Sequence, residues 1–136
     1  MDLTRIIENI CNELGYNYVY GNKSHINLID QNGALEPDKF HLLLFPINTG
    51  NKNNNDSSRT CNGNFFFVMP DEFAQSYKDK FETKIEPCKI TLAILEDRIS
   101  YCENIDIIQF TSIDAVDILD ANLTGLWVTF QFKVYE

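Results

Sequence analysis

The segment that most constrains the fold is GLWVTFQFKV, residues 125–134, because its side chains alternate in character. In an extended strand, successive side chains point to opposite faces of the sheet. The face expected to join the hydrophobic core consists of Val128, Phe130, Phe132 and Val134. The opposite face is aromatic at both ends and polar between them, and it consists of Trp127, Thr129, Gln131, Lys133 and Tyr135. We therefore expect a strand whose second face is covered either by a helix of the same chain or by a neighbouring subunit.

Helical patterns lie earlier in the chain. Residues 3–14 place apolar side chains at helical spacing, and Gly15 can end that helix. Residues 86–102 repeat apolar side chains at alternating steps of four and three, with Pro87 in a first-turn position. A weaker pattern over residues 73–85 predicts another helix. Because proline discourages helical geometry in the residue before it, we expect a corner between these last two helices.

Strand patterns occupy most of the remaining chain, at residues 16–21, 25–29, 39–47, 65–69, 105–110, 112–119 and 125–134. The expected order is α, β, β, β, β, α, α, β, β, β. This order predicts an α+β domain, in which an antiparallel sheet carries its helices on one face. The length of 136 residues suits a single domain that spans residues 1–136.

A long polar segment, NTGNKNNNDSSRTCNGN, interrupts the strand patterns at residues 48–64. It has no apolar periodicity, so it predicts a long polar loop, which can also be the tip of a long hairpin. Loops of this length in compact domains are usually functional or disordered. We expect Asn53, Asn54, Asn55 and Arg59 of this segment to contact a neighbouring subunit.

The charge balance restricts the partners of the protein. A net charge of −9 argues against a nucleic-acid-binding surface, because phosphate contacts require clustered lysine and arginine. An acidic wall can still lie beside DNA that must pass without sticking. No apolar run is long enough for a membrane span, and residues 1–10 lack the features of a signal peptide. We therefore expect no membrane association, and a protein made and kept in a cytoplasm.

Candidate catalytic and metal-binding residues are few. The cysteines have neither Cys-x-x-Cys spacing nor a nearby histidine, and they are Cys11, Cys61, Cys88 and Cys102. Cys88 and Cys102 would lie roughly 21 Å apart on one helix, too far for a disulfide. We expect reduced and mostly buried thiols. Neither His25 nor His41 has an acid or a nucleophile at a recognised spacing, so structural histidines are favoured.

The best carboxylate set is Asp114, Asp117 and Asp120, in SIDAVDILDANLTG. On a strand Asp117 points away from the other two, so the three cannot bind one ion without a bulge. We favour solvated acids on a strand, followed by a turn shaped by Asp120, Asn122, Thr124 and Gly125. A divalent-metal enzyme that uses the three aspartates is the minor alternative. The prediction is a protein without enzymatic activity or cofactor.

Several segments together resemble the tail-terminator and neck (head-to-tail completion) proteins of tailed bacteriophages. These segments are NELGYNYVYGN, KFHLLLFPI, IEPCKITLAILEDRI and DILDANLTGLWVTFQFKV, so the resemblance covers most of the chain. Many such proteins end in Asn-x-Thr-Gly followed by an aromatic-rich strand, which is matched here by Asn122, Thr124, Gly125 and Trp127. The motifs do not separate a long-tail terminator from a ring protein of a short-tailed phage, such as a crAss-like phage.

The resemblance implies a structural virion protein without catalytic residues. Such a protein would be made in the host bacterial cytoplasm and would form a homo-oligomeric ring around the DNA channel, six-fold or twelve-fold, in contact with other tail, neck or portal proteins. On this basis Trp127, Thr129 and Tyr135 join the candidate interface residues. A small acidic adaptor or inhibitor that binds one protein partner is the alternative from another class.

Overall fold

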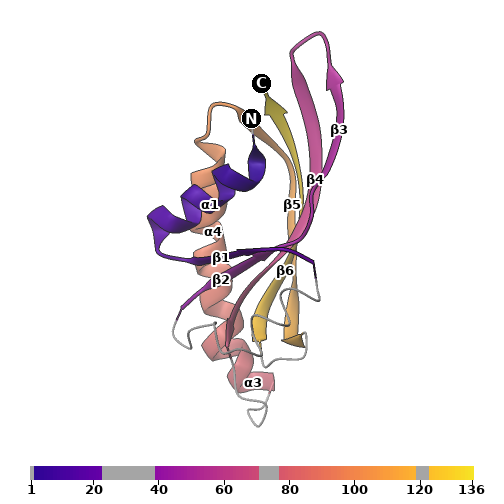
Figure 1. Ribbon diagram of the computed structural model, residues 1–136. Coiled ribbons are helices and arrows are strands. Elements are labelled where there is room, and N and C mark those ends of the chain that lie inside the picture. Colours follow the sequence, from indigo (N-terminus) through magenta and orange to yellow (C-terminus); the bar gives the residue numbers. More distant parts are fainter. Residues whose placement is uncertain (1, 23–38, 71–76, 119–122) are drawn as a thin grey trace.

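The structure, a computed structural model, describes residues 2–22, 39–70, 77–118 and 123–136 (Figure 1). Its elements follow in the order α1 (Leu3–Leu14), β1 (Asn17–Tyr20), β2 (His41–Leu44), β3 (Asn48–Asn53), β4 (Ser58–Pro70), α3 (Tyr77–Lys80), the π-helical turn η1 (Phe81–Ile85), α4 (Glu86–Ser100), β5 (Ile105–Ile118) and β6 (Leu123–Tyr135). The expected strand at 25–29, His25 and the start of the expected helix at 73–85 lie outside the described residues.

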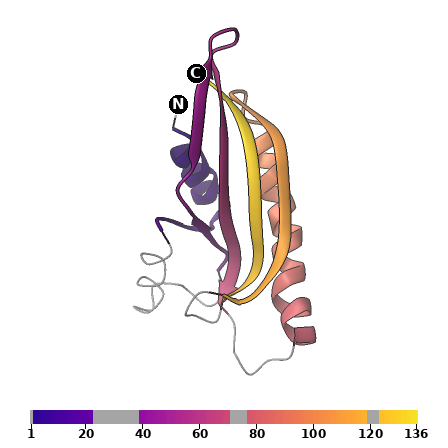
Figure 2. The same cartoon turned by 90° about the vertical axis from the view of Figure 1, so that its right-hand side faces the viewer.

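The strands form one six-stranded sheet in the order β1-β2-β4-β6-β5, with β3 paired to β4. Both α1 and α4 lie on the same side of this sheet (Figures 1 and 2). The expected α+β class with helices on a sheet is therefore confirmed. The expectation of a purely antiparallel sheet is wrong, because β1 pairs with β2 in parallel while the other pairs are antiparallel.

Helix α1 has the boundaries that its sequence predicts. The Oδ1 atom of Asp2 accepts a hydrogen bond from the Thr4 amide at 3.1 Å, which satisfies one of the free donors of the first turn. At the other end Gly15 adopts φ +79°, and its N–H donates to the Asn12 carbonyl. This left-handed conformation suits glycine, which has no Cβ to clash.

No corner separates the helices around Pro87. Glu86, which precedes the proline, is helical at φ −60° and ψ −48°, and its N–H donates five residues back to the Phe81 carbonyl. Proline has no N–H, and its ring clashes with the carbonyl four residues earlier in a regular helix. The π turn directly before Pro87 changes this pairing and relieves the clash, so the chain continues straight into α4.

Residues 48–64 form a long hairpin, which is the alternative that the sequence left open beside a polar loop. Strand β3 pairs with the first part of β4, with Lys52 opposite Arg59 and Asn53 opposite Ser58. The hairpin extends beyond the rest of the sheet (Figure 1). The strand pairing itself was not predicted, because these polar strands bury few side chains and their pairing leaves no apolar alternation in the sequence.

Two further expectations near the C-terminal strands are corrected. The strands expected at 105–110 and 112–119 are one strand, β5, whose register shifts between Ile107 and Gln109. Thr124 and Gly125 belong to β6 rather than to a turn, since Gly125 lies opposite Val68 of β4. A Cβ on Gly125 would lie 2.3 Å from the Phe67 carbonyl oxygen, so glycine is required there by close strand approach. Asp120 and Asn122 lie outside the described residues.

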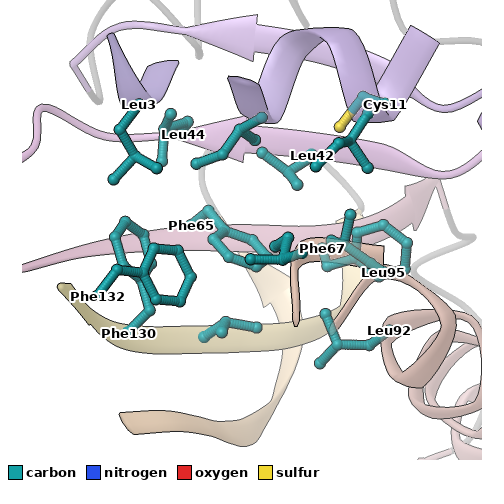
Figure 3. Close-up of a cluster of buried hydrophobic side chains, with 14 of the residues drawn as sticks. Leu3, Cys11, Leu42, Leu44, Phe65, Phe67, Leu92, Leu95, Phe130 and Phe132 are labelled. Carbon is teal, nitrogen blue, oxygen red and sulfur yellow. The ribbon is translucent and has the colours of Figure 1, made fainter. Parts of the chain in front are cut away.

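The main core lies between the helices and the sheet. Figure 3 shows side chains of α1, β2 and α4 meeting the aromatic rings of β4 and β6. The predicted core face of β6 is confirmed, because its four side chains are at most 4% exposed: Val128, Phe130, Phe132 and Val134. The rings of Phe130 and Phe132 stack with centroids 4.5 Å apart. Phe130 also covers Gly63, where a Cβ would lie 2.5 Å from the ring.

Candidate subunit interface

The face of the sheet opposite the helices is the candidate interface, and we call it the open face. Within the described residues no helix lies over β4, β6 and β5 on this side (Figure 2). The cross-strand register sets which side chains share the open face, since directly paired residues point the same way. Three sections follow one another along β6, and they are aromatic, amide-rich and charged.

The aromatic section surrounds Trp127. Its ring lies 4.4 Å from the ring of Phe66 and 5.6 Å from that of Phe45, centroid to centroid. Ile113, directly opposite Trp127 on β5, is 65% exposed. Trp127 is half-buried against Phe45 and Phe66 of its own sheet, and among the residues that the structure describes no helix covers it. The exposed part of this section remains open to another chain.

Beside it lies a smaller apolar cluster that the sequence did not reveal. It consists of the buried residues Leu43, Val68 and Leu123, packed against Val19, Phe45 and Phe66. The sheet therefore has apolar side chains on both faces near β1 and β2, and only its middle and the hairpin end are polar on the open side.

The amide-rich section occupies the middle of the open face. Gln131 of β6 lies opposite Asn62 of β4 and opposite Gln109 of β5. In the next row the Thr129 hydroxyl donates to the Asn64 Oδ1 atom at 2.9 Å. A shallow cavity of about 240 Å³ opens here, and its lining side chains carry no formal charge. This section can offer hydrogen bonds to a neighbour without bringing an ion into the contact.

The charged section lies at the hairpin end. The Lys133 Nζ atom is 2.6 Å from the Asp56 carboxylate and 5.4 Å from the centre of the Tyr135 ring. The Tyr135 hydroxyl donates to Asp106 at 2.8 Å, and this hydrogen bond raises the pKa of Tyr135. The hydrogen bond from Lys133 lowers the pKa of Asp56. These contacts tie the hairpin tip to β6 and β5, and so fix the hairpin relative to the open face.

The hairpin tip carries three of the predicted interface residues. Asn53 ends β3, and its Oδ1 atom accepts a hydrogen bond from the Asn55 amide at 3.0 Å. Asn54 and Asn55 are exposed in the turn. A side chain that satisfies the backbone in this way stabilises the turn locally. The tip thus presents asparagine side chains in a defined conformation.

Arg59 is not on the open face. Its register partner is Val134, which faces the helices, whereas Trp127, Thr129 and Tyr135 point to the other side. The Arg59 guanidinium donates to Glu136 at 2.8 Å and to the Gly50 carbonyl at 3.1 Å. The structure therefore brings together the predicted residues of β6, places the asparagines beyond them at the tip, and separates Arg59 from both.

Exposed apolar side chains outside the predicted set mark further candidate contacts. They include Ile108 and Ile113 on β5, Ile90 and Ile94 on α4, and Tyr101 directly after α4. The helical residues were detectable from the sequence, because they recur at helical spacing on the side of α4 opposite its core residues. The helix prediction for residues 86–102 rested on the core stripe, so the second apolar stripe on the opposite side was not recognised.

The structure shows the surroundings of several candidate catalytic and metal-binding residues. His41 is fully buried, and its Nδ1 atom lies 3.0 Å from the Asn17 amide nitrogen. Burial raises the pKa of the Cys11 and Cys88 thiols to about 12, so both stay protonated at neutral pH. Asp114 is half exposed beside Lys89 at 3.4 Å. The side chains of Asp117 and Asp120 lie outside the described residues.

Among the residues that the structure describes, no three His, Cys, Asp or Glu side chains gather where they could hold a metal ion. Within the same residues, no helix has the length and apolarity needed to cross a membrane. Comparisons with protein-family models, curated proteins and solved structures found no match to this chain.

Proposed function

We propose that the protein is a structural subunit of a homo-oligomeric ring in the tail or neck of a tailed bacteriophage. The ring surrounds the DNA channel and contacts neighbouring tail, neck or portal proteins. The proposal combines the sequence resemblance with one geometric observation, which is the relation between the edge strands β3 and β5 of the sheet.

The edge strands β3 and β5 lie at the same level of the sheet. Along one row, Lys52 of β3 faces Arg59, Arg59 faces Val134, and Val134 faces Ile105 of β5. Each successive pair in this row is antiparallel, so β3 and β5 run in opposite directions. Unpaired edge strands present backbone N–H and C=O groups that can pair with another chain.

This arrangement favours a closed ring. When copies are related by rotation about an axis parallel to the strands, the β5 edge of one copy meets the β3 edge of the next. The two edges are then antiparallel and level, which is the pairing already used within the subunit. Such head-to-tail contacts use two different surfaces of each copy and close into a ring when the rotation angle permits.

The amide-rich and charged sections of the open face suit the channel side of such a ring, whereas the aromatic section around Trp127 reaches the edge strand β5 at Ile113 and lies beside the next copy. The middle section of the open face carries amides and hydroxyls, and the Lys133 charge is balanced by Asp56. Tight binding of DNA requires cations that replace counterions along the phosphates. A neutral lining lets DNA pass without being held, and the acidic net charge of −9 acts in the same direction.

A mass measurement with edge variants tests the proposal. Asn51 in β3 and Ile108 in β5 have no directly opposite residue in the neighbouring strand, because the pairing register shifts at both places. Proline at either position therefore removes a backbone N–H from an edge strand and leaves every cross-strand residue pair in place. We expect wild-type protein to scatter light as a multiple of 15.7 kDa, and Asn51→Pro and Ile108→Pro to remain subunits. Ile108→Thr, which keeps the N–H, is the matched control and should assemble.

Electron microscopy of the wild-type assembly should show closed rings. Folded wild-type protein that stays monomeric both alone and with the particle's neighbouring components would contradict the ring and favour the acidic adaptor. Assembly that both proline variants leave intact would refute the role of the sheet edges.

A further inference from the structure

The side of α4 that does not pack into the core carries a self-complementary pattern, and we call it the outer face of α4. It consists of Lys89, Ile90, Ala93, Ile94 and Asp97, all of which are exposed. Ile90 is 69% exposed and Ile94 is 50% exposed, which is a high exposure for two neighbouring isoleucines on one helix. An apolar stripe on each side of a helix is typical of a helix that packs against two partners.

We propose that two copies of this chain associate through the outer faces of their α4 helices, which pack antiparallel about a two-fold axis at Ala93. A contact of this kind is isologous, so each residue meets the residue that the symmetry assigns to it on the other copy. The partner is thus a second copy, and charge and shape both argue for it.

The charges match under this symmetry. Lys89, Ala93 and Asp97 follow one another at four-residue spacing and therefore lie in one row along the helix. In an antiparallel pair centred on Ala93, Lys89 of each copy lies opposite Asp97 of the other, so the contact contains two ion pairs. Lys89 also lies 3.4 Å from Asp114 of its own chain. Its ammonium group has three N–H donors, so it can bind Asp114 and the Asp97 carboxylate of the other copy at the same time.

The shapes match as well. Ala93 is small, so the two helix axes can approach to about 8–10 Å at the crossing. The two-fold axis is perpendicular to the plane of the helices, so it keeps Ile90 and Ile94 of both copies on the same side of the contact. There the isoleucines of the two copies form one apolar cluster.

The size of the contact predicts its strength. Helix α4 spans Glu86–Ser100, roughly 22 Å, so a pair of these helices lies at or below the low end of stable interfaces, about 1,200 Å². Association should therefore be weak and depend on concentration. The outer face of α4 does not include the backbone edges of β3 and β5, so this contact is separate from the proposed ring contact.

Disulfide trapping tests the geometry directly. Facing Cα atoms at the crossing would lie about 3.5–5.5 Å apart, a range that overlaps the span of a disulfide. In a Cys102→Ser background at about 100 µM, Ala93→Cys should form a covalent dimer under mild oxidation. Ser100→Cys, exposed on the same helix, should not, because the symmetry places its two copies roughly 21 Å apart. Equal trapping at both positions, or trapping at neither, would overturn the proposal.

Charge reversal tests the ion pairs in solution. By sedimentation velocity, Lys89→Glu alone and Asp97→Lys alone should each weaken dimerisation at least about tenfold, since each places like charges opposite one another. The double variant Lys89→Glu/Asp97→Lys exchanges both charges and should restore the wild-type constant to within about threefold. Asp114→Asn, which removes only the contact within the chain, should not weaken it. A double variant that stays as weak as the single ones would refute the antiparallel pairing.

Discussion

The packing of Phe130 over Gly63 gives a quantitative prediction about the core. Phe130 is 1% exposed, and its ring occupies the position that a side chain on Gly63 would need, with the Cζ atom 2.5 Å from an ideal Cβ. Phe130→Ala removes the ring and should cost about 3–5 kcal/mol of unfolding free energy. Gly63→Ala forces a methyl group into the ring and should cost about 1–3 kcal/mol.

The double variant should be less destabilised than the sum of the two single ones. Without the ring, the methyl group introduced at position 63 fills part of the space that the ring has left, and it no longer meets a close neighbour there. We therefore expect Phe130→Ala/Gly63→Ala to cost about as much as Phe130→Ala alone, with a coupling of about 1–3 kcal/mol. Urea denaturation of the four proteins measures this coupling.

Additive effects of the two substitutions would contradict the packing of Phe130 against Gly63. Free energies that add to within about 0.5 kcal/mol would mean that the ring and the glycine are independent. Total stabilities of small domains are only about 5–15 kcal/mol, so Phe130→Ala can leave too little folded protein. In that case Phe130→Leu is used in the cycle in place of Phe130→Ala. The coupling free energy with Gly63→Ala should have the same sign, because leucine also leaves space next to Gly63.

Three further predictions concern the surface and the thiols. Trp127→Ala should keep most of its thermal stability but weaken ring assembly in light scattering; unfolding without a separate assembly defect would make Trp127 a core residue. At pH 8 a thiol reagent should label the half-buried Cys102 quickly and Cys88 only on unfolding, because burial raises the pKa of Cys88 to about 12. The hydrogen bond from Lys133 lowers the pKa of Asp56, so the unfolded chain binds more protons and stability should fall as pH drops from about 4 towards the lower pKa of the folded state. Asp56→Asn should reduce that dependence in denaturant titrations at pH 3 and pH 7.

Local patterns in the sequence predict the elements whose side chains divide between core and solvent. Helix α1 has an apolar stripe, a capping aspartate and a terminal glycine, and all three are encoded within Asp2–Gly15. The core face of β6 is equally local, since alternation alone separates Phe130 from Trp127. These elements were predicted because the information that specifies them is contiguous in the chain.

Pairing between distant segments is not encoded locally, and the errors are concentrated there. Strand β3 has six residues, and apart from Gly50 all of them are polar. It is a strand because its backbone pairs with that of β4. The parallel pairing of β1 with β2 likewise depends on the route of the chain between them. Arg59 was grouped with the asparagines of the tip as a candidate contact, but its face follows from the register of β4 with β6, which the sequence does not state.

The candidate interface was predicted in part for the same reason. Alternation placed Trp127, Thr129 and Tyr135 on one face, and the structure agrees. The amide-rich section needs three strands to come together, so no single segment reveals it. The outer face of α4 lay within one segment, but its isoleucines are indistinguishable by residue type from those of a core stripe.

The position of β4 between β2 and β6 has a consequence for how the protein is made. During synthesis β4 leaves the ribosome long before its second neighbour, and contacts such as that of Arg59 with Glu136 join residues 77 positions apart. One edge of β4, with its phenylalanines, therefore stays unpaired until β6 has left the ribosome. Nascent chains in this state expose a strand edge and apolar rings to other chains on the same messenger. Expression at lower temperature, or with a chaperone that holds unfolded chains, should thus increase the yield of native protein.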